Sequence, residues 1–218
     1  MSKAVIFDLD GTLIDSIPDV RLALNTVLES HGNRPLTRDE LETLVGEGAM
    51  PMIRGAFAMT GDTPDDLQDA LRQYLDHYAA HPVRETTLYD GAVAMLEQLR
   101  QQGYVLAVCT NKPQRMTDLV LRDLGIAPLF AAAIGGDTLP WRKPDGRHIL
   151  STLEQAGGAA KAVMIGDSHN DIQAAKHIGM ASVAVSFGYC HDGVETLGAD
   201  RVIDHFDQLP TTLKDLGL

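Results

Sequence analysis

The sequence predicts an α/β fold: a doubly wound, Rossmann-like parallel sheet with an all-helical cap domain inserted after its first strand. Three observations support this prediction. Short apolar runs alternate with segments of helical periodicity through most of the chain, which is typical of a sheet covered by helices on both faces. The alternation stops between residue 16 and about residue 84, where amphipathic helices follow one another without a strand. Polar residues directly follow several of the apolar runs.

The predicted strands are short apolar runs of the kind found in buried parallel sheets. The first run ends at Asp8, and the later ones are separated by segments in which apolar residues recur at helical spacing, as in Ala92, Leu96 and Leu99. The later strands are predicted at Val105–Cys109, Ala131–Ile134, Ala162–Ile165 and Ser182–Val185, with a sixth candidate at Arg201–Ile203.

The segment after the first strand is predicted to be the cap. Its apolar residues recur three or four positions apart, as in Val20, Leu24 and Val27, and prolines at positions 18, 35, 51 and 64 mark helix starts or turns. We therefore expect residues 1–15 and 86–218 to form the α/β core, and residues 16–85 to form the helical cap.

Composition limits the kinds of partner. The 218 residues carry a formal net charge of −12, whereas nucleic-acid binding requires a basic surface that neutralises phosphates. No apolar run approaches the roughly 20 residues of a membrane span. The two cysteines, Cys109 and Cys190, form neither a disulfide framework nor a metal-ligand cluster. The sequence predicts a cytoplasmic protein that binds neither nucleic acid nor membrane, and it leaves protein partners open.

Polar residues gather where the predicted strands end. The carboxyl ends of parallel strands share one edge of the sheet, and ligands bind beyond that edge in open α/β folds. Each residue has a plain structural alternative, such as a turn at Asp10 and Gly11 or a helix N-cap after Asp167. Their shared position at one edge favours a functional site. The set comprises Asp8, Asp10, Thr110, Asn111, Lys143, Asp167 and Asp171.

The spacing of Asp8 and Asp10 suggests the chemistry. Residues two apart on a strand share a face, and carboxylates about 4 Å apart repel by roughly 4 kcal/mol at an effective dielectric constant of 20. We expect Mg²⁺ and Lys143 to neutralise the pair. Phosphoryl transfer would then use Asp8 as nucleophile, Asp10 as general acid and base, and Thr110 and Lys143 to bind the phosphoryl oxygens. Asp8, Asp167 and the backbone carbonyl of Asp10 offer the hard oxygen ligands that Mg²⁺ prefers.

Four segments, in this order, resemble the signature motifs of the haloacid dehalogenase superfamily: FDLDGTLIDS, CTNK, RKPD and GDSHND. Together with LVGEGA in the cap, they are most similar to the phosphoglycolate phosphatases of that superfamily. The resemblance implies Asp8 as nucleophile and Asp10 as acid and base. It also implies Mg²⁺ ligands at Asp8, Asp10 and Asp167, phosphate ligands at Thr110 and Lys143, and a supporting role for Asp171. We expect Asn111, beside Thr110, to bind substrate as well.

The cap loop Val45–Ala49 is predicted to face the phosphate. Gly46 and Gly48 would let backbone N–H groups approach a ligand closely, and the N-terminus of the following helix favours a negative group. A short substrate with a phosphate at one end and a carboxylate at the other would suit this pocket, so the predicted substrate is 2-phosphoglycolate. Arg54 is either a second contact or part of a surface salt bridge. Three residues have no assigned role: Arg54, His169 and Cys190.

Other activities fit the residues less well or stay open. Haloacid dehalogenases lack the second aspartate, and phosphonatases need a cap lysine, whereas residues 15–85 contain none. Sugar phosphomutases of this cap type usually carry a histidine where Val20 stands. Phosphatases acting on pyrophosphate or a sugar phosphate remain alternatives. A phospho-aspartate signalling module would be much shorter, and its inner strand would end in the acceptor aspartate, whereas Val105–Cys109 is followed by Thr110.

Overall fold

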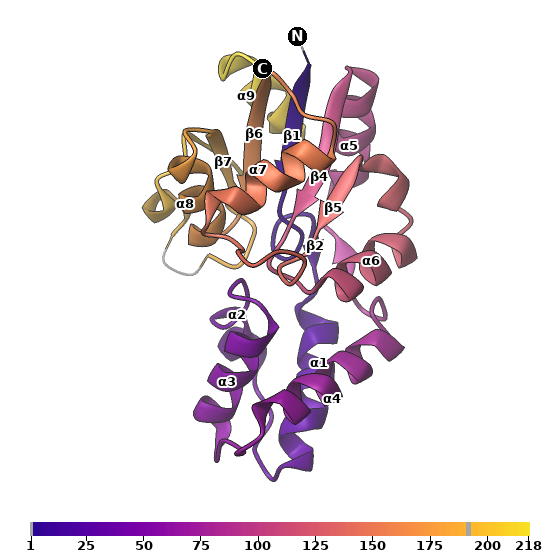
Figure 1. Ribbon diagram of the computed structural model, residues 1–218, viewed down its shortest axis with the longest axis vertical. Helices are drawn as coiled ribbons and strands as arrows, with labels where there is room; N and C mark the ends of the chain where they lie inside the picture. Colours follow the sequence, from indigo (N-terminus) through magenta and orange to yellow (C-terminus); the bar gives the residue numbers. More distant parts are fainter. Residues whose placement is uncertain (1, 191–192) are drawn as a thin grey trace.

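The computed structural model describes residues 2–190 and 193–218, and the centre of this part is a six-stranded sheet. Every pair of neighbouring strands in the sheet is parallel. Figure 1 shows the carboxyl ends of the strands directed toward a separate group of helices. The predicted strands and fold class are confirmed. In spatial order the strands are β5 (Ala132–Ile134), β4 (Tyr104–Cys109), β1 (Lys3–Phe7), β6 (Lys161–Gly166), β7 (Ala181–Val185) and β8 (Arg201–Ile203).

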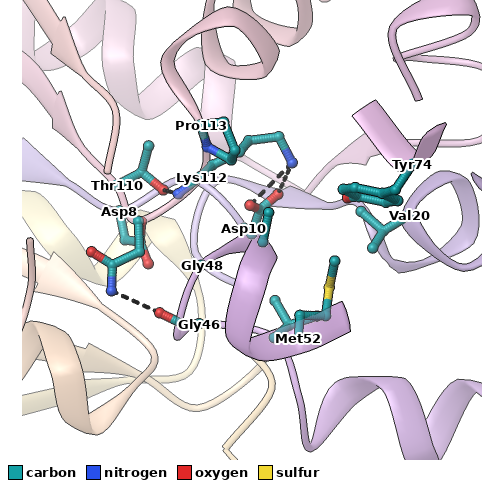
Figure 2. Close-up of a pocket in the computed structure, with 13 residues that line it drawn as sticks. Asp8, Asp10, Val20, Gly46, Gly48, Met52, Tyr74, Thr110, Lys112 and Pro113 are labelled. Carbon is teal, nitrogen blue, oxygen red and sulfur yellow. Dashed lines mark hydrogen bonds and ion pairs between the residues drawn. The ribbon is translucent and has the colours of Figure 1, made fainter. Parts of the chain in front are cut away.

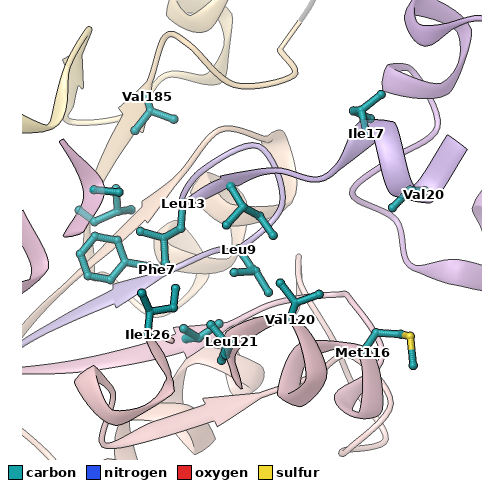
Figure 3. Packing of buried hydrophobic residues seen from close by; sticks show 14 of the residues in the cluster. Phe7, Leu9, Leu13, Ile17, Val20, Met116, Val120, Leu121, Ile126 and Val185 are labelled. Carbon is teal, nitrogen blue, oxygen red and sulfur yellow. The ribbon is translucent and has the colours of Figure 1, made fainter. Parts of the chain in front are cut away.

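Helices cover both faces of the sheet, because successive side chains of a strand point to opposite faces. Phe7 of β1 belongs to the larger apolar cluster, with Val120 and Leu121 nearby in Figure 3. Its neighbour Ile6 belongs to a second cluster with Ile149. The larger cluster includes side chains of α5 (Ala92–Gln101), α6 (Gln114–Asp123) and α9 (Leu209–Asp215), and the second includes side chains of α7 (Gly146–Gln155) and α8 (His169–His177).

Residues 16–85 are all described, and the helices in this segment form the group beyond the carboxyl edge of the sheet (Figure 1). Buried apolar residues join these helices, including Leu24, Phe57 and Tyr78. We call them the cap helices: α1 (Ile17–Ser30), α2 (Arg38–Glu42), α3 (Ala49–Thr60) and α4 (Leu67–Ala80). The exact positions at which the chain divides into core and cap stay a prediction. Within the described residues, no helix has the length and apolar character required to cross a bilayer.

A small antiparallel ribbon joins the cap helices to the core, and the sequence did not predict it. It consists of β2 (Ile14–Asp15) and β3 (Thr87–Leu88), with Ile14 opposite Leu88 and Asp15 opposite Thr87. Two-residue strands are too short to produce the alternation from which a strand can be recognised. The ribbon brings together the two chain segments that connect cap and core.

A buried carboxylate binds these two connecting segments to each other. Asp19, in the first turn of α1, accepts hydrogen bonds from the backbone N–H groups of Arg84, Glu85 and Thr86 at 2.8–3.1 Å, and from the Thr86 hydroxyl at 2.7 Å. Burial alone would raise the pKa of Asp19, but the hydrogen bonds from Thr86, Glu85 and Arg84 outweigh it and lower that pKa. We call this arrangement the Asp19 clasp.

Candidate active site

The fold brings the predicted site residues together at one edge of the sheet. Asp8 follows β1, Thr110 follows β4 and Asp167 follows β6, and these three strands are neighbours. The backbone continues the sheet just past the strand ends, since Asp8 N donates to Ile165 O at 2.9 Å. Lys143 comes from the loop between β5 and α7, and Asp171 from the first turn of α8.

Lys143 is the buried centre of a charge network. Its Nζ lies 2.9 Å from Asp8 Oδ1 and 2.6 Å from Asp171 Oδ1, and only 1% of the side chain is exposed. Burial on its own would lower the pKa of Lys143, but the carboxylates of Asp171 and Asp8 outweigh it and raise that pKa. The ammonium is therefore kept charged next to Asp8.

Three carboxylates meet beside this ammonium. Asp8, Asp167 and Asp171 offer oxygen atoms that all lie within 4.8 Å of one another. Burial raises the pKa of Asp8 to about 6, although Lys143 acts in the opposite direction. Burial, with the charges of Asp171 and Asp8, raises the pKa of Asp167 to about 8. Lys143 alone does not offset the negative charge, so the cluster suits a further cation.

The three carboxylates are not equally available as ligands. Asp171 Oδ1 accepts from Lys143, and Oδ2 accepts from the backbone N and the hydroxyl of Ser168 at 3.0 and 2.6 Å. Asp171 also closes the capping box of α8 through these contacts with Ser168. Asp8 and Asp167 line the space open to ligands whereas Asp171 does not, which favours Asp8 and Asp167 as the metal ligands and Asp171 as the residue that holds Lys143.

The backbone around Gly11 leaves room for Asp167. Gly11 has φ +78°, and a Cβ atom there would lie 2.2 Å from Asp167 Oδ2. Asp167 is held by the Thr12 hydroxyl, which donates to Oδ1 at 2.8 Å, and by Tyr189 N, which donates to Oδ2 at 2.9 Å. Gly11 is therefore required both for the turn that follows Asp10 and for the close approach of the Asp167 carboxylate.

Asp10 is paired with a lysine that the sequence did not predict for it. Lys112 Nζ lies 2.8 and 3.1 Å from the two carboxylate oxygens of Asp10, and the Ser16 hydroxyl donates to Oδ1 at 2.5 Å. Lys143 contacts Asp8 but is not paired with Asp10 among the contacts of the described residues. Sequence reasoning missed Lys112, although it is the last residue of the CTNK segment, because a lysine after a strand usually lies in solvent.

The cap loop is bound to the core at Gly46. Its carbonyl accepts from Asn111 Nδ2 at 2.8 Å, the bond that the dashed line to Gly46 marks in Figure 2, and from Asn170 Nδ2 at 3.2 Å. Gly46 and Gly48 have φ +110° and +94°, a region that favours glycine. Asn111 Nδ2 also donates to Lys143 O at 2.9 Å. Contact of Asn111 with substrate stays a prediction, since this amide group already joins three loops.

The docked cap loop covers a small, partly open cavity of about 40 Å³ beside Asp8 and Asp10. A wider opening of about 380 Å³ lies on the other side of the two aspartates, and His169 and Cys190 line it together with Asp167. Arg54, on α3, is exposed, and it is not among the described residues that line the cavity or the wider opening. The smaller cavity, of about 40 Å³, is lined by Asp8, Asp10, Val20, Val45, Gly46, Gly48, Ala49, Met52, Tyr74, Thr110, Asn111, Lys112 and Pro113.

Comparison with protein families decides the affiliation of the chain. A family model described as haloacid dehalogenase-like hydrolase matches residues 5–185, which contain the whole charge network described above. The chain belongs to the haloacid dehalogenase-like hydrolases. This confirms the resemblance that the four motifs indicated, and it makes the chain an enzyme of the hydrolase class.

Curated relatives within the haloacid dehalogenase-like hydrolases cover nearly the whole chain. The chain is 42% identical to the phosphoglycolate phosphatase of Agrobacterium fabrum over 216 residues, which covers 98% of this chain and 93% of the relative. It is 41% identical to the phosphoglycolate phosphatase of Caulobacter vibrioides over 210 residues, covering 94% and 88%. The expected similarity to phosphoglycolate phosphatases is therefore confirmed.

Two solved structures share the whole architecture. A predicted phosphoglycolate phosphatase from Haemophilus somnus superposes with a TM-score of 0.91 at 30% identity, covering 97% of this chain and 98% of that one. CbbY from Rhodobacter sphaeroides, solved in complex with phosphate, superposes with a TM-score of 0.82 at 26% identity, covering 96% of each chain. The likeness extends over both the sheet and the cap helices.

Proposed function

We propose that the protein is a Mg²⁺-dependent phosphomonoesterase that forms an aspartyl-phosphate on Asp8 and acts on 2-phosphoglycolate. The observation that carries this proposal is the arrangement around the cavity under the cap loop. Asp8 lies at its floor in contact with Lys143, and Asp10 lies beside it in contact with a separate cation, Lys112. Two adjacent aspartates with different partners are suited to two different chemical roles.

In the first step, a carboxylate oxygen of Asp8 attacks phosphorus and the bond to the leaving oxygen breaks. Lys143, 2.9 Å from Asp8, supplies a charge to the phosphoryl oxygens, and the hydroxyl of the buried Thr110 supplies a hydrogen bond. Asp10, in its protonated form, gives its proton to the leaving alkoxide. The alcohol leaves, and the phosphoryl group stays on Asp8.

In the second step, water displaces Asp8 from phosphorus. Asp10 is now a carboxylate and takes a proton from the attacking water, so the residue that acted as acid acts as base. Inorganic phosphate leaves, and Asp10 carries the proton that the next cycle requires. The cap loop, bound to Asn111 and Asn170, restricts access of bulk water to the cavity during both steps.

The residues present fit Mg²⁺. Asp8, Asp167 and the backbone carbonyl of Asp10 would hold the ion through hard oxygen atoms, with Asp171 as support. When bound, Mg²⁺ supplies positive charge that offsets the carboxylates and the phosphoryl oxygens. The raised pKa values of Asp8 and Asp167, which arise largely from burial, support a need for such a charge.

Removal of divalent metal is expected to abolish phosphatase activity, because the buried carboxylates of Asp8 and Asp167 would repel the substrate phosphate. The measurement is phosphate release after exhaustive chelation with EDTA and dialysis. Activity should return on addition of Mg²⁺, whereas Na⁺ at the same ionic strength serves as the control. Full activity of the metal-free protein would contradict the metal assignment.

The size of the cavity supports a small leaving group. A water molecule needs about 10–15 Å³ of the space that is open to water centres. A cavity of 40 Å³ therefore holds about three waters. The cavity beside Asp10 therefore favours a short leaving group, such as a two-carbon carboxylate, over a nucleotide. The relatives named phosphoglycolate phosphatase support the same substrate.

The test is a phosphate-release panel that compares kcat/KM with Mg²⁺ across small phosphorylated metabolites. The panel includes 2-phosphoglycolate, hexose and pentose phosphates, pyrophosphate, and xylulose 1,5-bisphosphate, with which the D10N variant of CbbY was solved. We expect 2-phosphoglycolate to be among the best substrates. If it is hydrolysed no faster than unrelated sugar phosphates, the phosphatase assignment survives but the substrate assignment does not.

Replacing Gly48 with leucine is expected to lower kcat/KM for 2-phosphoglycolate by about tenfold or more, since strain of 1–3 kcal/mol is typical at such backbone angles. Gly48 has φ +94°, and a Cβ atom there would lie 3.3 Å from Asn111 O and 3.7 Å from Arg142 Nε. The cap loop could not dock as it does now. A small aryl phosphate should lose less, because it depends less on the cavity under the cap loop.

The matched control for this variant is Gly32→Leu. Gly32 also has positive φ (+79°), but a Cβ atom there meets nothing within 4 Å. Gly32→Leu therefore introduces a similar backbone strain without adding a side-chain contact near the site. Equal losses of kcat/KM in the two variants, or equal losses for the two substrates in Gly48→Leu, would contradict the role of the cap loop.

A further inference from the structure

We propose that Lys112 binds the carboxylate of the substrate and so selects phosphate monoesters whose leaving group is an anion. This inference rests on the proposed function, and it names the residue that binds the part of the substrate remote from phosphorus. The juxtaposition that carries it is a buried ammonium in the wall of the cavity under the cap loop, next to the expected acid and base, Asp10.

Lys112 is the one cation that lines the cavity in the described part of the chain, residues 2–190 and 193–218. Lys143 lies beneath, committed to Asp8 and Asp171. The other charged groups of the lining are Asp8 and Asp10, which would repel a substrate carboxylate. An anionic leaving group that enters this space has Lys112 as its available counter-charge.

The position of Lys112 matches the position of the leaving group. Figure 2 shows its Nζ beside Asp10, on the side away from Asp8 and toward the ring of Tyr74. Because Asp10 must reach the leaving oxygen, the rest of the leaving group lies within reach of the residue that contacts Asp10. Val20 and Met52 line the same end of the cavity and leave little room beyond a short chain.

The ammonium has capacity for another partner. It has three N–H donors, and the contacts at 2.8 and 3.1 Å with the two Asp10 oxygens engage two of them. Nζ also lies 4.7 Å from the ring centroid of Tyr78, which holds it at the cavity wall. With only 4% of the side chain exposed, a carboxylate contact there would be shielded from water and from salt.

The rival explanation is that Lys112 only positions Asp10. Because loss of Lys112 alone would leave the Asp10 carboxylate unpaired and repelling, the Lys112 variants are also made in an Asp10→Asn background. If Lys112 only positions Asp10, its removal in that background leaves carboxylate recognition unchanged. The experiment therefore measures binding of two non-hydrolysable ligands that differ only in the remote group. 3-Phosphonopropionate replaces the bridging oxygen of 2-phosphoglycolate with a methylene group, and propylphosphonate carries a methyl group in place of the carboxylate.

Dissociation constants for both ligands are measured by calorimetry, with Mg²⁺ present, for the wild type, Lys112→Met, Lys112→Gln and Lys112→Arg. The control is Lys214→Met, which removes an exposed lysine of α9. Thermal melting identifies any variant that does not fold. The quantity compared is the preference, the ratio of the Kd of propylphosphonate to that of 3-phosphonopropionate.

We expect the wild type and Lys214→Met to prefer 3-phosphonopropionate. Lys112→Met and Lys112→Gln should lose about 10- to 100-fold of that preference, the usual size of a hydrogen bond to a charged group, and Lys112→Arg should keep part of it. An unchanged preference in a folded Met or Gln variant overturns the inference and leaves the proposed substrate intact. A wild type without any preference for the carboxylate overturns the proposed substrate as well.

Discussion

Replacing Asp8 with asparagine is expected to abolish turnover, with kcat falling by about 10⁴-fold or more, as for loss of a covalent nucleophile. An amide is a far weaker nucleophile than a carboxylate. It is also a neutral ligand at the site where Mg²⁺ is expected. The change keeps the shape of the side chain, so the amide oxygen can still accept the hydrogen bond that Lys143 now donates to Asp8 at 2.9 Å. The measurement is phosphate release together with a thermal melt.

The matched control is Asp90→Asn, which makes the same chemical change on a side chain that is 99% exposed. It should retain wild-type activity, because an exposed carboxylate contributes little. Rapid acid quenching and intact-protein mass spectrometry should reveal a phosphorylated species in the wild type and none in Asp8→Asn. Activity of folded Asp8→Asn within tenfold of the wild type would rule out the proposed nucleophile.

Replacing Asp10 with alanine is expected to lower turnover by about 10²–10⁴, the usual contribution of a positioned acid and base. The nucleophile survives, but the leaving alkoxide receives no proton and the attacking water loses none. An aryl phosphate, whose leaving group needs no proton, should still phosphorylate Asp8, so the phosphoenzyme should accumulate with that substrate. Quenched samples analysed by mass spectrometry measure this accumulation.

The structure requires a second variant at this position. Alanine would leave Lys112 without the carboxylate that it contacts at 2.8 Å and would remove the acceptor of the Ser16 hydroxyl. Asp10→Asn keeps an acceptor oxygen for both groups but cannot transfer a proton as a carboxyl does. Equal losses of activity for good and poor leaving groups in both variants, without detectable phosphoenzyme, would contradict the assignment of Asp10.

Most of the core could be predicted from the sequence because its signals are local. An apolar run such as Val105–Cys109 is recognisable as a strand without knowledge of its neighbours, and parallel strands bring their carboxyl ends to one edge. The ribbon of β2 and β3 could not be predicted in this way. Its strands have two residues each, and Ile14 and Leu88 pair across more than seventy intervening residues.

The site was predictable only to the extent that each residue follows a strand or belongs to a motif. Asp8, Thr110 and Asp167 meet this condition. Lys112 meets it too, as the last residue of the CTNK segment, but its contact with Asp10 could not be predicted, because the two residues are 102 positions apart and meet through the packing of β4 beside β1. Mg²⁺ and Lys143 were expected to neutralise both aspartates. Lys143 contacts Asp8 whereas Lys112 contacts Asp10, because the direction of a long side chain depends on tertiary contacts, and the contribution of Mg²⁺ stays a prediction.

The Asp19 clasp also has a consequence for the exchange of backbone amide protons with solvent. The N–H groups of Arg84, Glu85 and Thr86 all donate to one carboxylate, so none of them depends on a strand or helix for protection. Release of Asp19 frees the three together. In deuterated water their exchange rates should therefore rise and fall as a unit, and this shared rate would report how often the two segments that connect cap and core separate from each other.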